Sequence, residues 1–187
     1  MFPVTFLPEQ YRKQWCIAGG AAACPALAAD IDVWVYGIDT DELDGVRAVI
    51  LSYLEQLIAG FNVNKPIWPE KRYRLESLVE CEEFVAYEHA HCRIEKVAIV
   101  TSPKRFPVRV KPVHIMVTDA PDPGTILQGF DVSTHAVAID YDGRIWKGNN
   151  WTHPGEKPIA LLDNEKTPER MARIAARFGH TLEAAIG

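Results

Sequence analysis

Apolar and polar residues alternate most clearly at residues 30–35. The apolar side chains fall at positions 31, 33 and 35, and the positions between them hold Asp30, Asp32 and Trp34. This period of two predicts a strand that carries both carboxylates on one face. The two groups would stand roughly 6.5–7 Å apart along the strand, which leaves room for a pair of divalent metal ions between them.

A helical period follows at residues 43–58, where apolar side chains recur at spacings of three and four. It predicts an amphipathic helix of about sixteen residues that ends at Gly60. A second helix is expected at 167–179, where Thr167 can serve as the N-cap. A short helix is also expected after Pro8, leading into the glycines at 19 and 20.

The second half of the chain carries several short β-prone runs. They lie at 96–101, 108–111, 113–118, 136–139 and 145–147. The second and third runs predict a hairpin, and Asp142-Gly143 predicts the turn of another. Residues 75–92 fit a helix in their first part and a strand in their second, so both possibilities stay open there.

Residues 61–95 look like an insertion into an otherwise continuous domain. Cys81, His89, His91 and Cys92 could be interpreted as a metal cluster. Their spacing matches no common zinc pattern, however. The alternative is a partly exposed strand or turn that happens to carry polar residues.

A glycine pair precedes the two aspartates. Nine residues separate Gly19-Gly20 from Asp30. A glycine turn has little side-chain bulk, so its backbone N–H groups can approach an anion. The alanine-rich segment after it would start a short helix whose N-terminus favours phosphate. The alternative is a glycine turn before an edge strand whose aspartates are merely solvated.

The stretch 18–33 resembles the signature of the nucleotidyltransferase-fold superfamily, the polymerase-beta-like proteins. That signature is a small residue, Gly, Gly or Ser, a gap of about nine to thirteen residues, then Asp-apolar-Asp/Glu-apolar. Ala18-Gly19-Gly20 and Asp30-Ile31-Asp32-Val33 match every fixed position. The resemblance implies that Asp30 and Asp32 hold Mg²⁺ or Mn²⁺. It also implies that Gly19 and Gly20 bind the β- and γ-phosphates of a nucleoside triphosphate.

The chain after residue 107 resembles the same superfamily more loosely, in particular its phage-like and viral members. The segment around Asp131 is similar to the Arg-Arg-Asp-x-x-x-Asn-x-x-Ala motif of tRNA nucleotidyltransferases and poly(A) polymerases. Gly129 and Phe130 stand where that group has its arginines, and His135 replaces its asparagine, so its substrate is not carried over. Asp131 is our first choice for a third catalytic, metal-binding acid, although a cap or turn acid is the alternative. Weaker choices are Asp140 and Asp142.

Basic residues offer candidate phosphate contacts in two places. The segment 104–111 carries four cations and no acid, and Arg109 and Lys111 are the candidates for nucleotide binding there. A solvated strand face gives the same pattern. A row of arginines on the predicted C-terminal helix has the same two interpretations, and it consists of Arg170, Arg173 and Arg177.

The bulk composition fits one domain with a real core, since 48% of the 187 residues are hydrophobic. A net charge of −5 argues against a protein that coats nucleic acid non-specifically. No apolar run is long enough to span a membrane, and the N-terminus lacks the form of a targeting peptide. With no CxxC spacing, the cysteines are expected to be reduced thiols in the cytoplasm, a host cytoplasm if the origin is a phage.

These patterns predict a single α/β (α+β) domain built on a small mixed β-sheet with helices packed on one face, and the resemblance implies the nucleotidyltransferase type. The expected activity is transfer of a nucleoside monophosphate to an acceptor hydroxyl on RNA, protein or a small molecule. Two alternatives stay open. One is a catalytically inactive nucleotidyltransferase-like binding module, and the other is a metal-dependent phosphodiester hydrolase.

Overall fold

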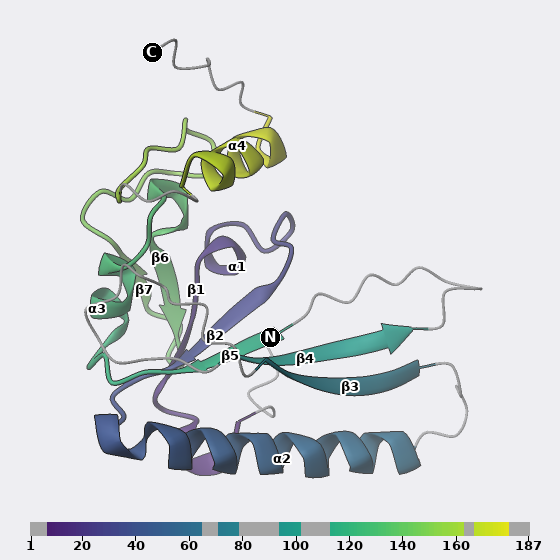
Figure 1. Cartoon of the computed structure of the whole chain (residues 1–187). Helices are drawn as coiled ribbons and strands as arrows, with labels where there is room; N and C mark the ends of the chain where they lie inside the picture. The colour runs from purple at the N-terminus through teal and green to yellow at the C-terminus, as the bar shows by residue number, and fades with distance from the viewer. Residues whose placement is uncertain (1–6, 65–70, 79–93, 102–112, 163–166, 180–187) are drawn as a thin grey trace.

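A mixed sheet of seven strands forms the centre of the protein (Figure 1). The computed structural model describes residues 7–64, 71–78, 94–101, 113–162 and 167–179. The strands are β1 (Trp15–Ala18), β2 (Ile31–Val35), β3 (Lys71–Leu78), β4 (Ile94–Thr101), β5 (Val113–Val117), β6 (Val137–Asp140) and β7 (Ile145–Lys147). The helices are α1 (Gly20–Ala23), α2 (Leu43–Asn64), α3 (Pro123–Gln128) and α4 (Thr167–Arg177), with 3-10 turns η2 (Glu9–Tyr11), η3 (Thr40–Glu42) and η4 (Ser133–His135).

The strand order is β3-β4-β5-β2-β1-β6-β7, and β2 and β5 are its parallel pair. The other neighbours run antiparallel. The mixed α+β class predicted from the sequence is therefore confirmed. The predicted turn at Asp142-Gly143 also joins two antiparallel strands, β6 and β7, with Gly143 at φ 81°.

The sequence does not predict β1, which lies between β2 and β6. All four of its residues are buried. A strand covered on both faces shows a continuous apolar run instead of an alternating one, so the period-two signal is absent. The helix expected after Pro8 is limited to the single 3-10 turn η2.

Helices cover both faces of the sheet, which corrects the expectation of helices on one face. On one side, Ile50 and Leu54 of α2 belong to the same buried cluster as Trp15 and Ile17 of β1. On the other side, the intervening β1 residues pack with α3 residues, and the shared cluster contains Cys16, Ala18, Ile126 and Leu127. Successive side chains of β1 thus point alternately into the two hydrophobic cores, so this one strand contributes to both.

The predicted helix at 43–58 is confirmed, but α2 continues past Gly60 to Asn64. A glycine inside a helix costs only about 1 kcal/mol relative to alanine, so it does not by itself end the helix. In the range 61–95, β3 and the first residues of β4 pair with each other at one end of the sheet. Within the described ranges, no helix is both long enough and apolar enough to cross a bilayer.

Burial of Cys16 gives a first testable prediction. The Cys16 thiol is fully buried, and this burial, aided by the nearby Asp140 carboxylate, raises its pKa well above the ordinary range. We expect Cys16 to resist iodoacetamide at pH 8 in the folded protein and to react in denaturant, because the thiolate is the nucleophile. Peptide mapping by mass spectrometry checks this against the partly exposed Cys24. Equal labelling of Cys16 and Cys24 in the folded protein would contradict the burial argument.

Candidate metal centre

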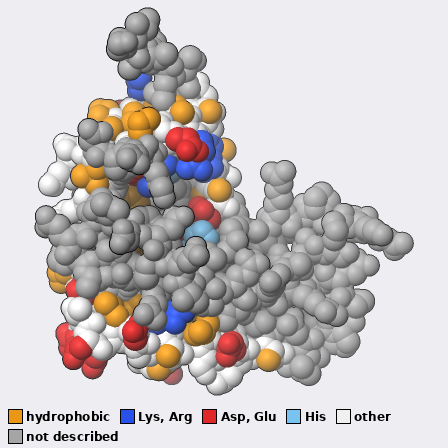
Figure 2. All heavy atoms as spheres, viewed as in Figure 1, with side chains coloured by type: hydrophobic (Ala, Val, Ile, Leu, Met, Phe, Trp, Pro, Cys, Tyr) orange, Lys and Arg blue, Asp and Glu red, His pale blue; other side chains and the backbone are white. Residues whose placement is uncertain are grey.

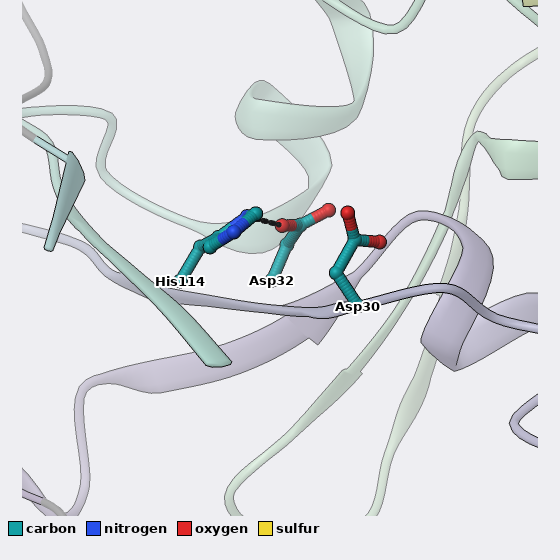
Figure 3. A group of neighbouring side chains, drawn as sticks. All are labelled: Asp30, Asp32 and His114. Atoms are coloured by element: carbon teal, nitrogen blue, oxygen red, sulfur yellow. Dashed lines mark hydrogen bonds and ion pairs between the residues drawn. The ribbon is translucent and has the colours of Figure 1, made fainter. Parts of the chain in front are cut away.

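Three potential metal ligands come together where β2 and β5 begin. Asp30 precedes β2, Asp32 lies in β2 and His114 lies in β5. One ligand atom from each residue lies within 4.8 Å of the others, and all three side chains are partly exposed. Figure 3 shows Asp32 between the other two, with all three side chains on the same side of the strands. This group is the candidate site.

The strand alternation explains why these side chains share a face. In β2, Ile31 and Val33 pack against the α2 side of the sheet, so Asp32 projects to the other side. The parallel register pairs Asp32 with His114 of β5. The two side chains are therefore neighbours, and His114 Nδ1 lies 3.1 Å from Asp32 Oδ1. A protonated Nδ1 donates a hydrogen bond that orients the carboxylate.

The diglycine turn lies directly against Asp32. Gly19 has φ 75°, and its backbone N–H donates to the Val137 carbonyl at 3.0 Å. A Cβ atom at Gly19 would lie 3.6 Å from Asp32 Oδ2 and 3.2 Å from Phe130 Cε1. The second carboxylate oxygen of Asp32 thus faces the turn. Gly19 and Asp32 are therefore neighbours in the structure.

The Gly19 position gives a second prediction. We expect Gly19→Ala to lower the free energy of unfolding by about 1–3 kcal/mol, because alanine is strained at this positive φ and Phe130 must move. The control is Gly45→Ala in α2, where a Cβ meets nothing within 4 Å. It should stabilise by about 0.5–1 kcal/mol. Urea unfolding measures both, and equal effects of the two substitutions would contradict the strain argument.

His135 lies against the second glycine of the turn. A Cβ atom at Gly20 would lie 3.5 Å from His135 Cε1 and 3.6 Å from Nε2. Burial lowers the pKa of His135 to about 4, helped by the positive charges of Arg170 and Arg177 and opposed by Asp30. The imidazole is therefore neutral at pH 7.

Acid should destabilise the protein through His135. Its pKa in the folded state, about 4, is below its ordinary value of 6.5, so the unfolded chain binds the proton first as pH falls. The loss of stability caused by His135 is absent above pH 6.5 and grows as pH falls towards 4. It reaches about 3 kcal/mol of unfolding free energy. We expect His135→Gln to remove that pH dependence in urea unfolding between pH 7 and 4. The exposed His153→Gln control should keep the wild-type slope, and a wild-type slope in His135→Gln would contradict the burial of a neutral imidazole.

Asp131, predicted as the third acid, does not join Asp30 and Asp32 in the structure. It is 3% exposed, and its Oδ1 lies 3.0 Å from Arg170 Nη1 in an ion pair. Its Oδ2 accepts a hydrogen bond from Thr167 at 3.3 Å. These contacts attach the start of α4 to the segment before η4. In this structure the third residue of the group is therefore His114, not Asp131.

The two weaker choices for a third acid belong to the β6–β7 hairpin. Asp140 Oδ2 accepts from Trp146 Nε1 at 2.8 Å, and its Oδ1 accepts from the backbone N–H groups of Asp142 and Arg144. Asp142 is exposed in the turn itself. Arg109, Lys111, Cys81, His89, His91 and Cys92 lie outside the described residues.

The donor set fits a divalent cation. Carboxylate oxygens suit Mg²⁺ and Mn²⁺, whereas imidazole nitrogen suits the transition metals better. If all three residues ligate, the set favours Mn²⁺ over Mg²⁺. If His114 instead donates its hydrogen bond to Asp32, the two carboxylates serve either ion and His114 orients one of them. On the face drawn in Figure 2, acidic and histidine side chains reach the surface side by side, where Figure 1 places α1 and β2.

Comparison with known proteins adds no evidence about this site. The chain matches no family model, no curated protein and no solved structure in the three comparisons made.

Proposed function

We propose that this protein transfers a nucleoside monophosphate from a nucleoside triphosphate to an acceptor hydroxyl, with pyrophosphate as the leaving group. One observation carries the proposal. The diglycine turn faces the Asp32 carboxylate, and Asp30 and His114 complete a group of ligand atoms within 4.8 Å. A site for a divalent cation and a site for phosphate oxygens are thereby adjacent.

Asp30 and Asp32 would hold the divalent cation, and His114 would either ligate it or fix the orientation of Asp32. The bound ion would neutralise phosphate charge and lower the pKa of the attacking hydroxyl. The acceptor oxygen forms a bond to the α-phosphorus while the bond from that phosphorus to the bridging oxygen breaks. The hydroxyl proton passes to solvent, and the displaced oxygen leaves as part of pyrophosphate.

The other side of the turn suits the triphosphate. The first backbone N–H groups of α1, those of Gly20 and Ala21, have no acceptor within the helix. The neutral His135 ring can donate one hydrogen bond beside them. Arg177 would add positive charge near this ring, whereas Arg170 is already paired with Asp131. The Gly19 N–H, by contrast, donates to the Val137 carbonyl, so Gly20 and Ala21, and not Gly19, would supply the backbone donors.

The products identify the reaction without knowledge of the acceptor. The purified chain is incubated with each of the four α-labelled nucleoside triphosphates and either Mg²⁺ or Mn²⁺. We expect pyrophosphate, together with labelled monophosphate on RNA, on the protein itself or, slowly, free after attack by water. A nucleoside diphosphate and inorganic phosphate would contradict the proposal, because the wrong bond would have broken.

The two alternatives give different results when RNA or DNA is added to the incubation and when the triphosphate is left out. Cleavage of RNA or DNA in the presence of metal but without any triphosphate would select a phosphodiester hydrolase. Binding of a triphosphate with no turnover under any metal would select an inactive binding module. Either outcome overturns the proposed transfer.

A further inference from the structure

A cleft of about 670 Å³ opens on the α3 side of the sheet. One wall is α3 and the residues that follow it, up to Phe130. The lining also includes residues 147–150, which begin with the last residue of β7, and Leu161 and Leu162. The volume falls within the range of about 300–1,000 Å³ that is typical of small-molecule sites.

The lining of the cleft suits an uncharged ligand. Its two charged side chains are already engaged, since Asp122 Oδ1 caps α3 through the Thr125 N–H at 2.8 Å. Lys147 Nζ lies 4.0 Å from the centre of the Trp151 ring. With one acid and one lysine, the lining has no net charge that would select an anion or a cation.

Amides and apolar groups make up much of the remaining lining. The amide side chains are Gln128, Asn149 and Asn150, all exposed. Within the described residues, no hydrogen bond to another side chain or to the backbone occupies these amide groups. The partly exposed Leu161 and Leu162 supply apolar surface beside them, and the edge of the Phe130 ring, which is 8% exposed, adds to it. Amides can pair with the donor and acceptor edge of a heterocycle while apolar and aromatic side chains contact its flat face.

Phe130 connects the cleft with the candidate metal centre. It lines the cleft, and its Cε1 would lie 3.2 Å from a Cβ at Gly19, the glycine that faces Asp32. One side chain therefore separates the cleft from the diglycine turn. The cleft therefore adjoins the turn that is proposed to hold the phosphates.

We propose that this cleft binds a nucleobase. The inference deepens the proposed nucleotidyl transfer and rests on it for the source of the base, which belongs either to the donor triphosphate or to a nucleotide of the acceptor. The ligand class itself follows from the cleft, because a planar heterocycle with amide-like edges matches three exposed amide side chains beside apolar and aromatic surface.

The test uses nucleosides, which have a base but no phosphate. Adenosine, guanosine, cytidine and uridine are titrated into the intact chain without metal, with binding followed by calorimetry or ligand-observed NMR. We expect at least one to bind, and Gln128→Ala with Asn149→Ala should weaken that binding about tenfold, roughly two lost hydrogen bonds. The matched control is Gln56→Ala, which removes an exposed amide from α2 on the far side of the sheet and should leave binding unchanged.

Competition then identifies the source of the base. If the cleft holds the donor base, the bound nucleoside competes with a non-hydrolysable triphosphate in Mn²⁺, and the double variant weakens triphosphate binding. If the cleft holds the acceptor base, nucleoside and triphosphate bind together.

The failures of the two proposals are distinguishable. No nucleoside binding, or equal binding by the double variant and wild type, overturns the cleft assignment even if pyrophosphate is produced. Nucleoside binding without any Mn²⁺ binding or monophosphate transfer overturns the proposed function but leaves the cleft as a nucleoside site. Asp32→Asn should leave nucleoside binding intact, because its carboxylate does not line the cleft.

Discussion

Asp32→Asn is expected to abolish Mn²⁺ binding and to reduce monophosphate transfer by at least about a hundredfold. Its two carboxylate oxygens are both part of the site, because Oδ1 contacts His114 Nδ1 at 3.1 Å and Oδ2 faces Gly19. Even residues that only support a metal ligand change affinity or activity by about 10–100-fold when replaced. Calorimetric or EPR titration with Mn²⁺ measures the first effect, and pyrophosphate release measures the second.

Four further variants make this result specific. Asp30→Asn should behave like Asp32→Asn, and His114→Ala should lower Mn²⁺ affinity about 10–100-fold. Asp41→Asn removes an exposed carboxylate from η3 and should change neither property. Asp131→Asn distinguishes the sequence prediction, in which Asp131 binds the metal, from the structure, in which Asp131 pairs with Arg170. Unchanged Mn²⁺ affinity agrees with a carboxylate paired to Arg170, whereas lost affinity would return Asp131 to the metal centre and contradict the present assignment.

The part of the site that is local in sequence is the part that the sequence predicts. Alternation at 30–35 places the two aspartates on one face, and Gly19-Gly20 lies only nine residues before Asp30. The structure brings Asp32 to that turn through the antiparallel pairing of β1 with β2, whose register joins Ala18 to Asp32. Short-range patterns therefore carry enough information for this half of the site.

His114 was not predictable in the same way, because its role depends on the parallel register of β2 and β5. The hydrogen bond from His114 to Asp32 joins residues 82 apart in the chain. One local signal was present, since His114 is the polar residue in the otherwise apolar run of β5. A polar side chain in such a run is a reason to look for a partner, but only the strand pairing identifies it.

Asp131 illustrates the opposite error, in which a motif predicts a role that burial changes. Sequence spacing does not reveal that this carboxylate is 3% exposed, nor that its cation comes from a helix that begins 36 residues later. A buried acid needs a charged or hydrogen-bonding partner, and α4 supplies both. The arginines of the predicted row therefore differ in role. Arg170 pairs with the buried Asp131, whereas the Arg173 side chain is mostly exposed to solvent.

Arg170→Met is expected to lower the free energy of unfolding by about 3 kcal/mol, because it leaves the Asp131 carboxylate buried without a compensating cation. That loss corresponds to a decrease in Tm of about 6–12 °C for a chain of this size. Thermal unfolding followed by circular dichroism measures it. Methionine keeps most of the side-chain volume, so the change reports on the charge more than on packing.

A second substitution tests whether the charge is the cause. In Arg170→Met with Asp131→Asn the buried carboxylate is gone, so part of the lost stability should return, and the double-mutant cycle should give a coupling energy of about 1–3 kcal/mol. Arg173→Met is the matched control on the same helix. Its side chain is 66% exposed and lies 3.9 Å from Glu169, so its removal should change stability by less than about 0.5 kcal/mol. Equal losses of stability in Arg170→Met and Arg173→Met would contradict the prediction. They would show that losing either arginine of α4 has the same effect, and that the ion pair with Asp131 adds nothing to stability.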